Sequence, residues 1–379
     1  MSGIYIHIPF CRKACHYCDF HFSTSLERKN EMVSAIIKEI ALRKDTDFPN
    51  KIQTIYFGGG TPSLLSYEEL MRIFEALQQS ALLTSDAEIT LEANPDDLTH
   101  QKLRELRQTP VNRFSIGIQS FFEEDLKLMN RAHSAHEGEY SVKAAQDAGF
   151  ENITIDLIYA IPGLTNDRWR KNLDSAIELH VPHISAYCMT IEEKTVFGKW
   201  EKAGKLNPTE DKVAHEHYQF LVKALSESGF EHYEVSNFGK PNRHSKHNTS
   251  YWKGLPYVGL GPSAHSFDGM NKRSWNINNN AVYTREIHQN RIPAEFEILS
   301  QKDFYNEKIM TGLRTALGIQ PEQILKQFGI NVNELFEEEI QRYQQQGWLL
   351  KTDNSIRLSE EGFFRADRIA SDFFITEEI

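Results

Sequence analysis

Cysteine is scarce in this sequence, and its distribution excludes one class of protein. Only four cysteines occur in 379 residues, and three of them fall within residues 11–18. A secreted domain held by disulfide bonds spreads its cysteines along the chain, so this clustering favours metal ligation or redox chemistry instead.

Basic residues are too few for a nucleic-acid-binding protein, and apolar runs are too short for a membrane-spanning one. Lysine and arginine total 42 against 53 acidic residues, a formal net charge of −11, and no basic stripe stands out. Nucleic acid is therefore not an expected partner, because its phosphates have to be met by a basic face. No apolar run approaches the length of a membrane span, and MSGIYIHIPF lacks the basic region and cleavage site of a signal peptide. These absences predict a cytoplasmic location.

What the sequence does have is an alternation of β-rich runs and amphipathic stretches up to about residue 190. The β-rich runs span 4–10, 54–60, 88–95, 113–120, 152–163 and 183–189. The amphipathic stretches between them span 27–43, 66–80, 99–108, 137–148 and 167–180. Six βα units in succession predict an α/β fold with a partial (β/α)6 TIM-like barrel, because eight units are needed for a closed one.

The pattern predicts three domains. Residues 1–195 form the partial barrel, and residues 196–300, where periodicity weakens, form a barrel extension and linker region. Residues 301–379 combine helices with a short hairpin at GWLLKTDNSIRLSEEG, a C-terminal α+β, winged-helix-like domain. Because this part carries nine basic and fourteen acidic residues, we expect a structural or docking role for it and no DNA binding.

Polar residues follow several of the predicted strands directly. Parallel α/β folds build their sites at the carboxyl ends of strands, so these residues should converge on one mouth of the barrel. They are the residues from Cys11 to Cys18, those from Gly58 to Thr61, and Glu92, Asn94, Gln119 and Asp156.

The segment CRKACHYCDF at residues 11–20 offers three thiols after the first strand: Cys11, Cys15 and Cys18. A four-iron, four-sulfur cluster normally takes four thiolates, so three leave one iron with an open coordination position. An amino-acid head group can chelate that iron, and the reduced cluster can pass an electron to a bound sulfonium, which is radical S-adenosylmethionine chemistry. The alternative is a structural zinc site completed by a nearby histidine, although no second pair of cysteines follows. The candidate histidines are His7, His16 and His21.

A glycine-rich stretch, FGGGTPSLL at residues 57–65, follows the second strand. Three glycines let the backbone approach a ligand closely, and their free N–H groups can bind a carboxylate or a phosphate. Such a stretch is more often a tight turn when it stands alone. One βα unit after the cysteines, however, it is placed to hold the methionine end of S-adenosylmethionine.

Taken together, these motifs resemble a known family. CxxxCxxC followed by GGGTP is similar to the radical S-adenosylmethionine superfamily. YIHIPFCxxxCxxC with GGGTPS, GIQSF and IDLIYAIPG resembles its coproporphyrinogen dehydrogenase-like branch, over Tyr5 to about residue 270. The resemblance implies that residues 1–195 form the radical S-adenosylmethionine barrel and that a [4Fe-4S] cluster is held by Cys11, Cys15 and Cys18. It implies a cofactor site formed by Tyr5, Tyr17, Gly59, Gly60, Thr61, Glu92, Gln119, Arg131 and Asp156.

Those residues have a plainer interpretation when they are taken singly. A lone Glu, Gln or Asp at a strand end is more often a helix cap or a loop partner. Arg131, in LMNRAH, follows a helix, where an arginine is commonly solvated, so sequence alone supports it least. The match between these positions and the motifs of the family is what favours the cofactor site.

The branch contains two functional classes, and Phe20 bears on the choice between them. The anaerobic coproporphyrinogen dehydrogenases resemble this sequence but carry CxxxCxxCxC and an N-terminal extension, whereas here Phe20 takes the place of the fourth cysteine and ten residues precede Cys11. The HemW-type heme chaperones carry CxxxCxxCxF and HNxxYW, which matches HNTSYW at residues 247–252. The resemblance therefore implies heme binding by His247, Asn248, Tyr251 and Trp252, since imidazole can ligate ferric heme and the aromatic rings can pack on a porphyrin.

If the chaperone class holds, the expected partners are heme and apo-hemoproteins such as respiratory cytochromes. Delivery to membrane complexes would then involve a peripheral contact with the membrane. Whether the protein forms a homodimer stays open. We then expect no coproporphyrinogen dehydrogenase activity. Two enzyme hypotheses stay open: an oxygen-independent coproporphyrinogen III oxidase, and a radical enzyme with another substrate. Among the remaining candidates, we expect His244 and His265 to bond loop backbone and Cys188 to pack on a buried strand.

Overall fold

The computed structural model describes residues 3–48 and 51–376. Within them a twelve-stranded sheet has the order β12-β11-β10-β9-β1-β2-β3-β4-β5-β6-β8-β7. Its strands are β1 (Gly3–Ile8), β2 (Lys51–Gly59), β3 (Leu82–Ala93), β4 (Arg113–Gln119), β5 (Ile153–Tyr159), β6 (His183–Cys188), β7 (Glu231–Glu234), β8 (Asn237–Gly239), β9 (Tyr257–Leu260), β10 (His265–Phe267), β11 (Lys272–Asn276) and β12 (Ala294–Ile298).

The first six strands confirm the predicted parallel α/β arrangement. β1 to β6 pair in chain order and in parallel, and β9 adds a parallel strand beside β1. The remaining pairs are antiparallel, and the order of the described strands runs from β12 to β7 without closing. The fold is therefore a partial, open TIM-like barrel.

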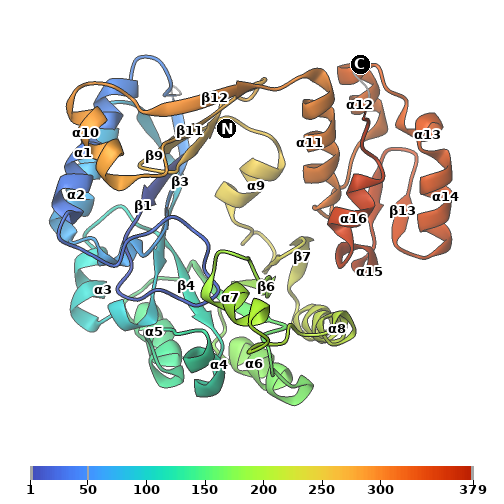
Figure 1. The fold of residues 1–379 in the computed structure, drawn as a ribbon, viewed down its shortest axis with the longest axis horizontal. Coiled ribbons are helices and arrows are strands. Elements are labelled where there is room, and N and C mark those ends of the chain that lie inside the picture. Colours follow the sequence, from blue (N-terminus) through green and yellow to red (C-terminus); the bar gives the residue numbers. More distant parts are fainter. Residues whose placement is uncertain (1–2, 49–50, 377–379) are drawn as a thin grey trace.

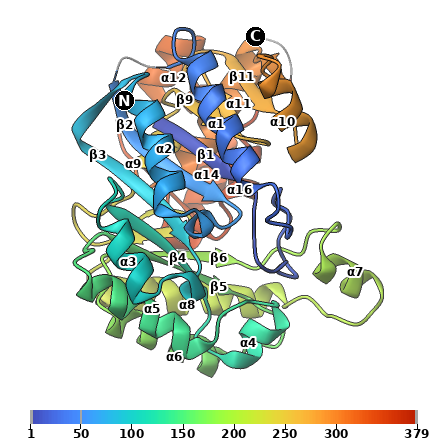
Figure 2. The ribbon, with the colours of Figure 1, turned by 90° about the vertical axis from the view of Figure 1, so that its left-hand side faces the viewer.

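Crossover helices connect the parallel strands and cover the outer face of the sheet (Figures 1 and 2). Two of them begin with reciprocal capping boxes, Ser66 with Glu69 and Ser134 with Glu137, which satisfy the first free backbone N–H groups. The helices of this part are α1 (Lys29–Arg43), α2 (Tyr67–Gln78), α3 (His100–Leu106), α4 (Glu123–Leu128), α5 (Ala135–Asp147) and α6 (Asn166–Glu178), with short 3-10 turns at Pro62–Leu64 and Pro95–Asp97.

Alternation along the strands separates an apolar outer face from a polar inner one. On β3, Ile89 and Leu91 are buried among the apolar core, whereas Glu88, Thr90 and Glu92 point to the other face. On that inner face, polar side chains bond one another across the strands, for example Ser115 of β4 with Asp156 of β5. A polar barrel interior is the setting that a binding site requires.

Residues 196–300 extend the sheet at both edges, which sequence periodicity did not reveal. The strands added here are three to five residues long, too short to show a period. α8 is the longest helix of this part, and α9 carries the HNTSYW motif. The helices are α7 (Val196–Lys202), α8 (Asp211–Glu227), α9 (Lys246–Trp252) and α10 (Asn280–His288).

The C-terminal helices form a separate group to one side of the sheet (Figure 1). The predicted hairpin is confirmed as β13 (Leu349–Lys351) paired with β14 (Ile356–Leu358). Hydrogen bonds such as Val235 N–H to the Arg314 carbonyl and Tyr218 O–H to the Glu360 carbonyl fasten this group to residues 196–300. Its helices are α11 (Gln301–Leu313), α12 (Pro321–Phe328), α13 (Val332–Leu335), α14 (Glu337–Gln345), α15 (Glu360–Phe363) and α16 (Ala366–Ser371). The three domain boundaries stay a prediction, and residues 1–2 and 377–379 of the outer domains lie outside the described residues.

Candidate cofactor and ligand sites

The cysteine loop lies between β1 and α1 and is held from two directions. On its own side, the Cys11 N–H donates to the Ser23 carbonyl at 3.0 Å. Across the barrel mouth, the His16 N–H donates to the Met129 carbonyl at 3.0 Å, and the Asn130 amide donates to the Ala14 carbonyl at 2.7 Å. Contacts from both sides fix the loop at the carboxyl ends of the strands.

All three thiols of this loop, Cys11, Cys15 and Cys18, are free and line one cavity of about 410 Å³. Most of the residues expected at the cofactor site line the same cavity, so the structure brings them together. These are Tyr17, Gly59, Gly60, Thr61, Glu92, Gln119, Arg131 and Asp156. We call it the cysteine cavity.

Tyr5 is the exception among the expected cofactor residues. It lines the neighbouring cavity, and its ring stacks on Tyr56 with the ring centroids 6.2 Å apart. Tyr56 itself lines the cysteine cavity, where its hydroxyl donates to Glu92 at 2.8 Å. Tyr5 therefore reaches the expected cofactor site through Tyr56.

Arg131, which sequence supported least, is a central residue of the cysteine cavity. Its Nη1 donates to Cys15 Sγ at 3.3 Å and to the Tyr17 hydroxyl at 3.4 Å. Its Nη2 donates to Asn94 Oδ1 and to the Gly117 carbonyl, both at 2.8 Å. Burial opposes the charge, but the neighbouring Tyr17 and Cys15 outweigh it and raise the Arg131 pKa, so the guanidinium stays charged.

The glycine-rich stretch packs tightly against the end of β1. A Cβ atom on Gly60 would lie 2.6 Å from the Phe10 carbonyl oxygen, which leaves no room for a side chain. The expectation of free N–H groups here is wrong: Gly59 donates to Glu92, Gly60 to the Ile8 carbonyl and Thr61 to the Phe10 carbonyl. The glycines therefore bring the loop close to the cysteines and leave the Thr61 side chain to line the cavity.

Two acidic side chains face this cavity, Glu92 from β3 and Asp156 from β5. Burial raises the pKa of Glu92 to about 7, although bonds from the Tyr56 hydroxyl and the Gly59 N–H oppose the shift. Burial likewise raises the pKa of Asp156 to about 6, against the bonds from Ser115 and Ser185. Both groups can therefore change protonation state near neutral pH, and perturbed pKa values of this kind cluster at functional sites.

The donor set of the cysteine cavity fits a cluster and a nucleoside. Within residues 3–48 and 51–376, no group of three or more His, Cys, Asp or Glu side chains is arranged to hold one metal ion. A cubane cluster does not need such convergence, because each thiolate binds a different iron. Arg131 also carries an unsatisfied donor. Its buried Nε has no hydrogen-bond partner, and the residue lines the cavity that a polar ligand would enter.

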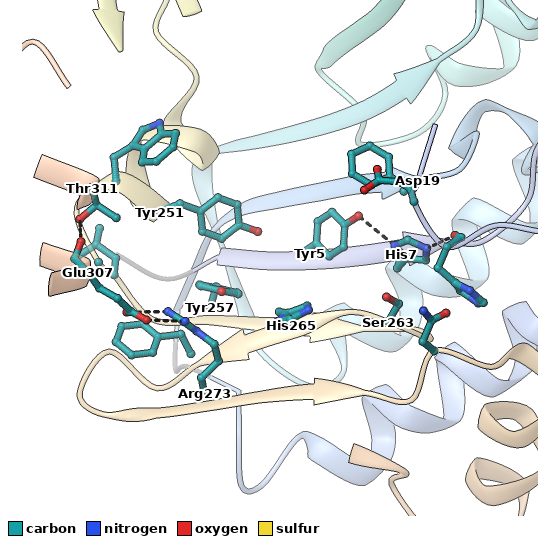
Figure 3. Close-up of a pocket in the computed structure, with 18 of the residues that line it drawn as sticks. Tyr5, His7, Asp19, Tyr251, Tyr257, Ser263, His265, Arg273, Glu307 and Thr311 are labelled. Atoms are coloured by element: carbon teal, nitrogen blue, oxygen red, sulfur yellow. Dashed lines mark hydrogen bonds and ion pairs between the residues drawn. The ribbon is translucent and has the colours of Figure 1, made fainter. Parts of the chain in front are cut away.

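A second cavity, of about 660 Å³, adjoins the first and is bounded by the cysteine loop, α9, the β9–β11 segment and α11 (Figure 3). Aromatic side chains form much of its wall: Tyr5, Phe20, Tyr251, Trp252, Tyr257, Phe267 and Phe304. The two cavities share the lining residues Asp19, Phe20, Gly59 and Glu92. Phe20, at the position of the missing fourth cysteine, is 68% exposed and stands where they meet. We call this second space the aromatic cavity.

The four residues expected to bind heme divide into two pairs. Tyr251 and Trp252 line the aromatic cavity, whereas His247 and Asn248 do not. His247 is 1% exposed, and both of its ring nitrogens are engaged, Nδ1 with the Thr54 hydroxyl at 2.8 Å and Nε2 with the Tyr251 hydroxyl at 2.9 Å. His247 is thus placed to hold Tyr251, and its heme ligation stays a prediction.

Three further expectations can be compared with the structure. The Nε2 atom of His244 lies 2.8 Å from a carboxylate oxygen of Glu231, and its ring stacks on Tyr233. The expectation that His244 bonds loop backbone is therefore wrong. His265 is exposed, lines the aromatic cavity and has no hydrogen-bond partner for its side chain among the described residues, so the expected bond to loop backbone is wrong here too. The assignment of Cys188 to buried packing is also wrong, because this residue ends β6, is exposed and lines the cysteine cavity.

Comparison with known proteins agrees with this arrangement. The family model of the radical SAM superfamily matches residues 5–176, and that of the HemN C-terminal domain matches residues 299–365. In fold, the chain is similar to the coproporphyrinogen III oxidase HemN of Escherichia coli, with a TM-score of 0.84 and 21% identity over 99% of this chain and 90% of that one. Fold and matched domains together define a radical SAM protein.

Curated relatives narrow the family further. The heme chaperone HemW of Lactococcus lactis is 34% identical, over 99% of this chain and 98% of its own. HemW of Bacillus subtilis is 31% identical, over 96% of each chain. The chain belongs to the HemW family of the radical SAM superfamily.

Family membership implies a [4Fe-4S] cluster and S-adenosylmethionine, and the cysteine cavity has the residues to hold both. Among the described residues, no helix combines the length and apolar character needed to cross a membrane.

Proposed function

We propose that this protein is a cytoplasmic heme chaperone that binds heme in the aromatic cavity and passes it to apo-hemoproteins such as respiratory cytochromes. The observation that carries the proposal is the aromatic cavity itself, whose wall includes Tyr251 and Trp252 of the HNTSYW motif. Flat aromatic walls with a few polar groups suit a large planar ligand. The HemW relatives are named heme chaperones, which supports the same ligand.

The cysteine cavity has a separate part in this proposal. Cys11, Cys15 and Cys18 hold the [4Fe-4S] cluster, and the residues from Gly59 to Thr61 with Glu92, Gln119 and Asp156 bind S-adenosylmethionine. When bound, the cluster supplies an electron to that cofactor. Arg131 holds the Cys15 sulfur and the Tyr17 hydroxyl in place, and Phe20 separates the cofactor from the heme.

The larger organisation belongs to the proposal as well. We assign residues 1–195 to the barrel, 196–300 to its extension and 301–379 to a docking domain. Heme acceptors in membrane complexes require a peripheral membrane encounter, and a homodimer would present two cavities to them.

The test is an anaerobic hemin titration of protein that carries an intact cluster. The native protein should bind hemin, and a Tyr251→Ala, Trp252→Ala double variant should bind it at least about tenfold more weakly because both rings leave the cavity wall. Tyr140→Ala is the matched control, since Tyr140 is an exposed tyrosine on α5 and lines neither cavity. Absence of hemin binding by the native protein would reject the proposal.

An oxygen-independent coproporphyrinogen III oxidase is the second candidate. It is favoured by the contact between the cavities, because a substrate in the aromatic cavity would lie beside the cofactor at Glu92 and Gly59. Phe20 argues against it, since the enzymes of this branch carry a cysteine at that position. An anaerobic assay with reductant and S-adenosylmethionine decides: vinyl product would establish the oxidase and overturn the ranking.

A further inference from the structure

Three histidines line the aromatic cavity: His7, His21 and His265. His7 has both ring nitrogens engaged, Nδ1 with the Tyr5 hydroxyl at 3.2 Å and Nε2 with the His21 carbonyl at 2.9 Å. His21 Nε2 bonds Asn280 at 2.7 Å. Among the described residues, the His265 side chain alone of the three has no hydrogen-bond partner.

His265 is also held in a fixed place on the cavity wall. It begins β10, where its backbone pairs with that of Trp275 of β11, and the centroids of the two rings lie 6.0 Å apart. Its backbone packs closely on Gly259 of β9, where a Cβ atom would clash with the His265 carbonyl. In Figure 3 its imidazole lies between Tyr5 and Tyr257, midway along the cavity. A free imidazole on a rigid strand is a preformed ligand for a metal in the middle of a planar molecule.

We propose that His265, and not His247, is the protein's ligand to the iron of heme in the aromatic cavity. This inference rests on the proposed function and deepens it. His247 would have to break two hydrogen bonds and leave a fully packed position to reach the iron, whereas His265 breaks none. His247 instead positions Tyr251 on the cavity wall.

Absorption and electron paramagnetic resonance spectra of the ferric heme complex test the assignment. His265→Ala should lose the signature of imidazole ligation, and free imidazole added to that variant should restore it. His247→Ala should keep the signature and bind hemin more weakly, because Tyr251 loses its partner. His136→Ala is the matched control, because His136 is an exposed histidine of α5 that lines neither cavity and its loss should leave the spectrum unchanged.

The outcomes separate the inference from the proposed function. If the native protein binds no hemin, the chaperone proposal itself fails. If it binds hemin but His265→Ala leaves the spectrum unchanged, or His247→Ala abolishes the imidazole signature, the assignment of His265 is overturned and heme binding stands.

A different observation, the charge distribution in the cavity, carries a second inference. Figure 3 shows Asp19 at one end and the Arg273–Glu307 pair at the other. Arg273 and Glu307 neutralise each other through two hydrogen bonds of 2.6 and 2.8 Å. Lys308, the next residue of α11, lines the cavity with no hydrogen bond or ion pair to the described residues, and burial lowers its pKa. Arg273 also lies 3.9 Å from the Glu297 carboxylate of β12, which does not line the cavity. Among the described lining residues at the α11 end, Lys308 is therefore the charged side chain left without a partner.

We infer that Lys308 binds a carboxylate of the ligand, so that heme enters with its propionates toward α11. A partly desolvated ammonium without a partner gains most from an anion placed beside it. The opposite orientation would bring the propionates to Asp19 and Glu92, where like charges meet. The C-terminal segment is then part of the binding site itself.

Paired titrations with hemin and with its dimethyl ester test this inference. Lys308→Met should weaken the binding of hemin at least about tenfold, corresponding to one charge-assisted hydrogen bond, and should leave the binding of the ester unchanged. Lys326→Met, at an exposed lysine of α12, is the control. The inference is overturned if Lys308→Met binds hemin as tightly as the native protein, or if it loses the same factor with both ligands.

Discussion

Arg131 connects the cysteine loop with the sheet through a single side chain. Its guanidinium fork bonds the loop at Cys15 and Tyr17, and the strand ends at Asn94 and Gly117. A lysine keeps the charge, but its single ammonium cannot reproduce this planar set of four bonds.

Arg131→Lys should therefore lower the free energy of unfolding of the cluster-loaded protein by about 1–3 kcal/mol, because buried acceptors lose their donors. The cluster should also be lost faster in air. Anaerobic urea unfolding and timed iron and sulfide analysis measure both effects. Arg104→Lys, at an exposed arginine of α3, is the control, and equal behaviour of the two variants would contradict this account.

Glu92 makes the cofactor-free protein less stable as the pH rises toward neutrality. Its pKa is raised from 4.5 to about 7 in the folded state, so between these values the folded protein binds more protons than the unfolded chain. Stability contributed by this group is therefore present below pH 4.5 and is lost as the pH rises through about 7. The full loss is at most about 3.5 kcal/mol.

Glu92→Gln should flatten this part of the pH profile, since the amide does not titrate. Urea unfolding of cofactor-free native and variant protein between pH 5 and 8 measures the slope. Asp156, whose pKa is raised to about 6, contributes in the same direction, so some slope should remain in the variant. If the slope for the variant is as steep as that of the native protein, Glu92 does not titrate between pH 5 and 8 and this account is wrong.

At the scale of one element, α9 depends on a carboxylate from another strand. This helix has seven residues, too few to be stable alone. Glu88 of β3 accepts hydrogen bonds from the backbone N–H groups of Lys246 and His247, at 3.1 and 3.0 Å. Glu88 thus fixes the start of the helix whose last turn presents Tyr251 and Trp252 to the aromatic cavity.

Glu88→Gln should lower the free energy of unfolding by about 1–3 kcal/mol and weaken hemin binding, because an amide is a poorer acceptor for the two N–H groups. Asp86→Asn is a matched control on the same strand. Asp86 pairs with the Lys246 ammonium at 3.1 Å on the surface, where solvent screens an ion pair and it contributes little to stability. Equal losses in both variants would refute the role of Glu88.

At the scale of the whole molecule, local signals explain which parts could be predicted. β1 to β6 were predictable because each is a β-rich run followed by an amphipathic helix. The pairing of β9 with β1 joins residues about 250 positions apart, such as Gly3 with Tyr257, and no local pattern encodes it. For the same reason, the contribution of α11 to a cavity could not be predicted.

The candidate sites show the same limit. Cys11, Cys15 and Cys18 were predictable because their spacing is itself the signal, and the structure places them at one cavity. The motif HNTSYW identified α9 but not which of its side chains face a ligand, since that depends on Thr54 and Glu88 from other strands. Lys308 and His265 become candidates only because distant segments leave them unpartnered beside one cavity.

Besides the cysteine loop, the aromatic cavity joins three further parts of the chain, and ligand binding should therefore protect these three together. These parts are the end of α9, the β9–β11 segment and the face of α11 from Phe304 to Thr311. Hydrogen exchange measured by mass spectrometry with and without hemin should show slower exchange in residues 246–257, 265–276 and 301–313, because a bound ligand reduces local opening. α14, which lines neither cavity, is the internal control and should exchange at an unchanged rate. Protection confined to residues 246–257 would show that heme contacts the HNTSYW motif alone and that the C-terminal segment takes no part in binding.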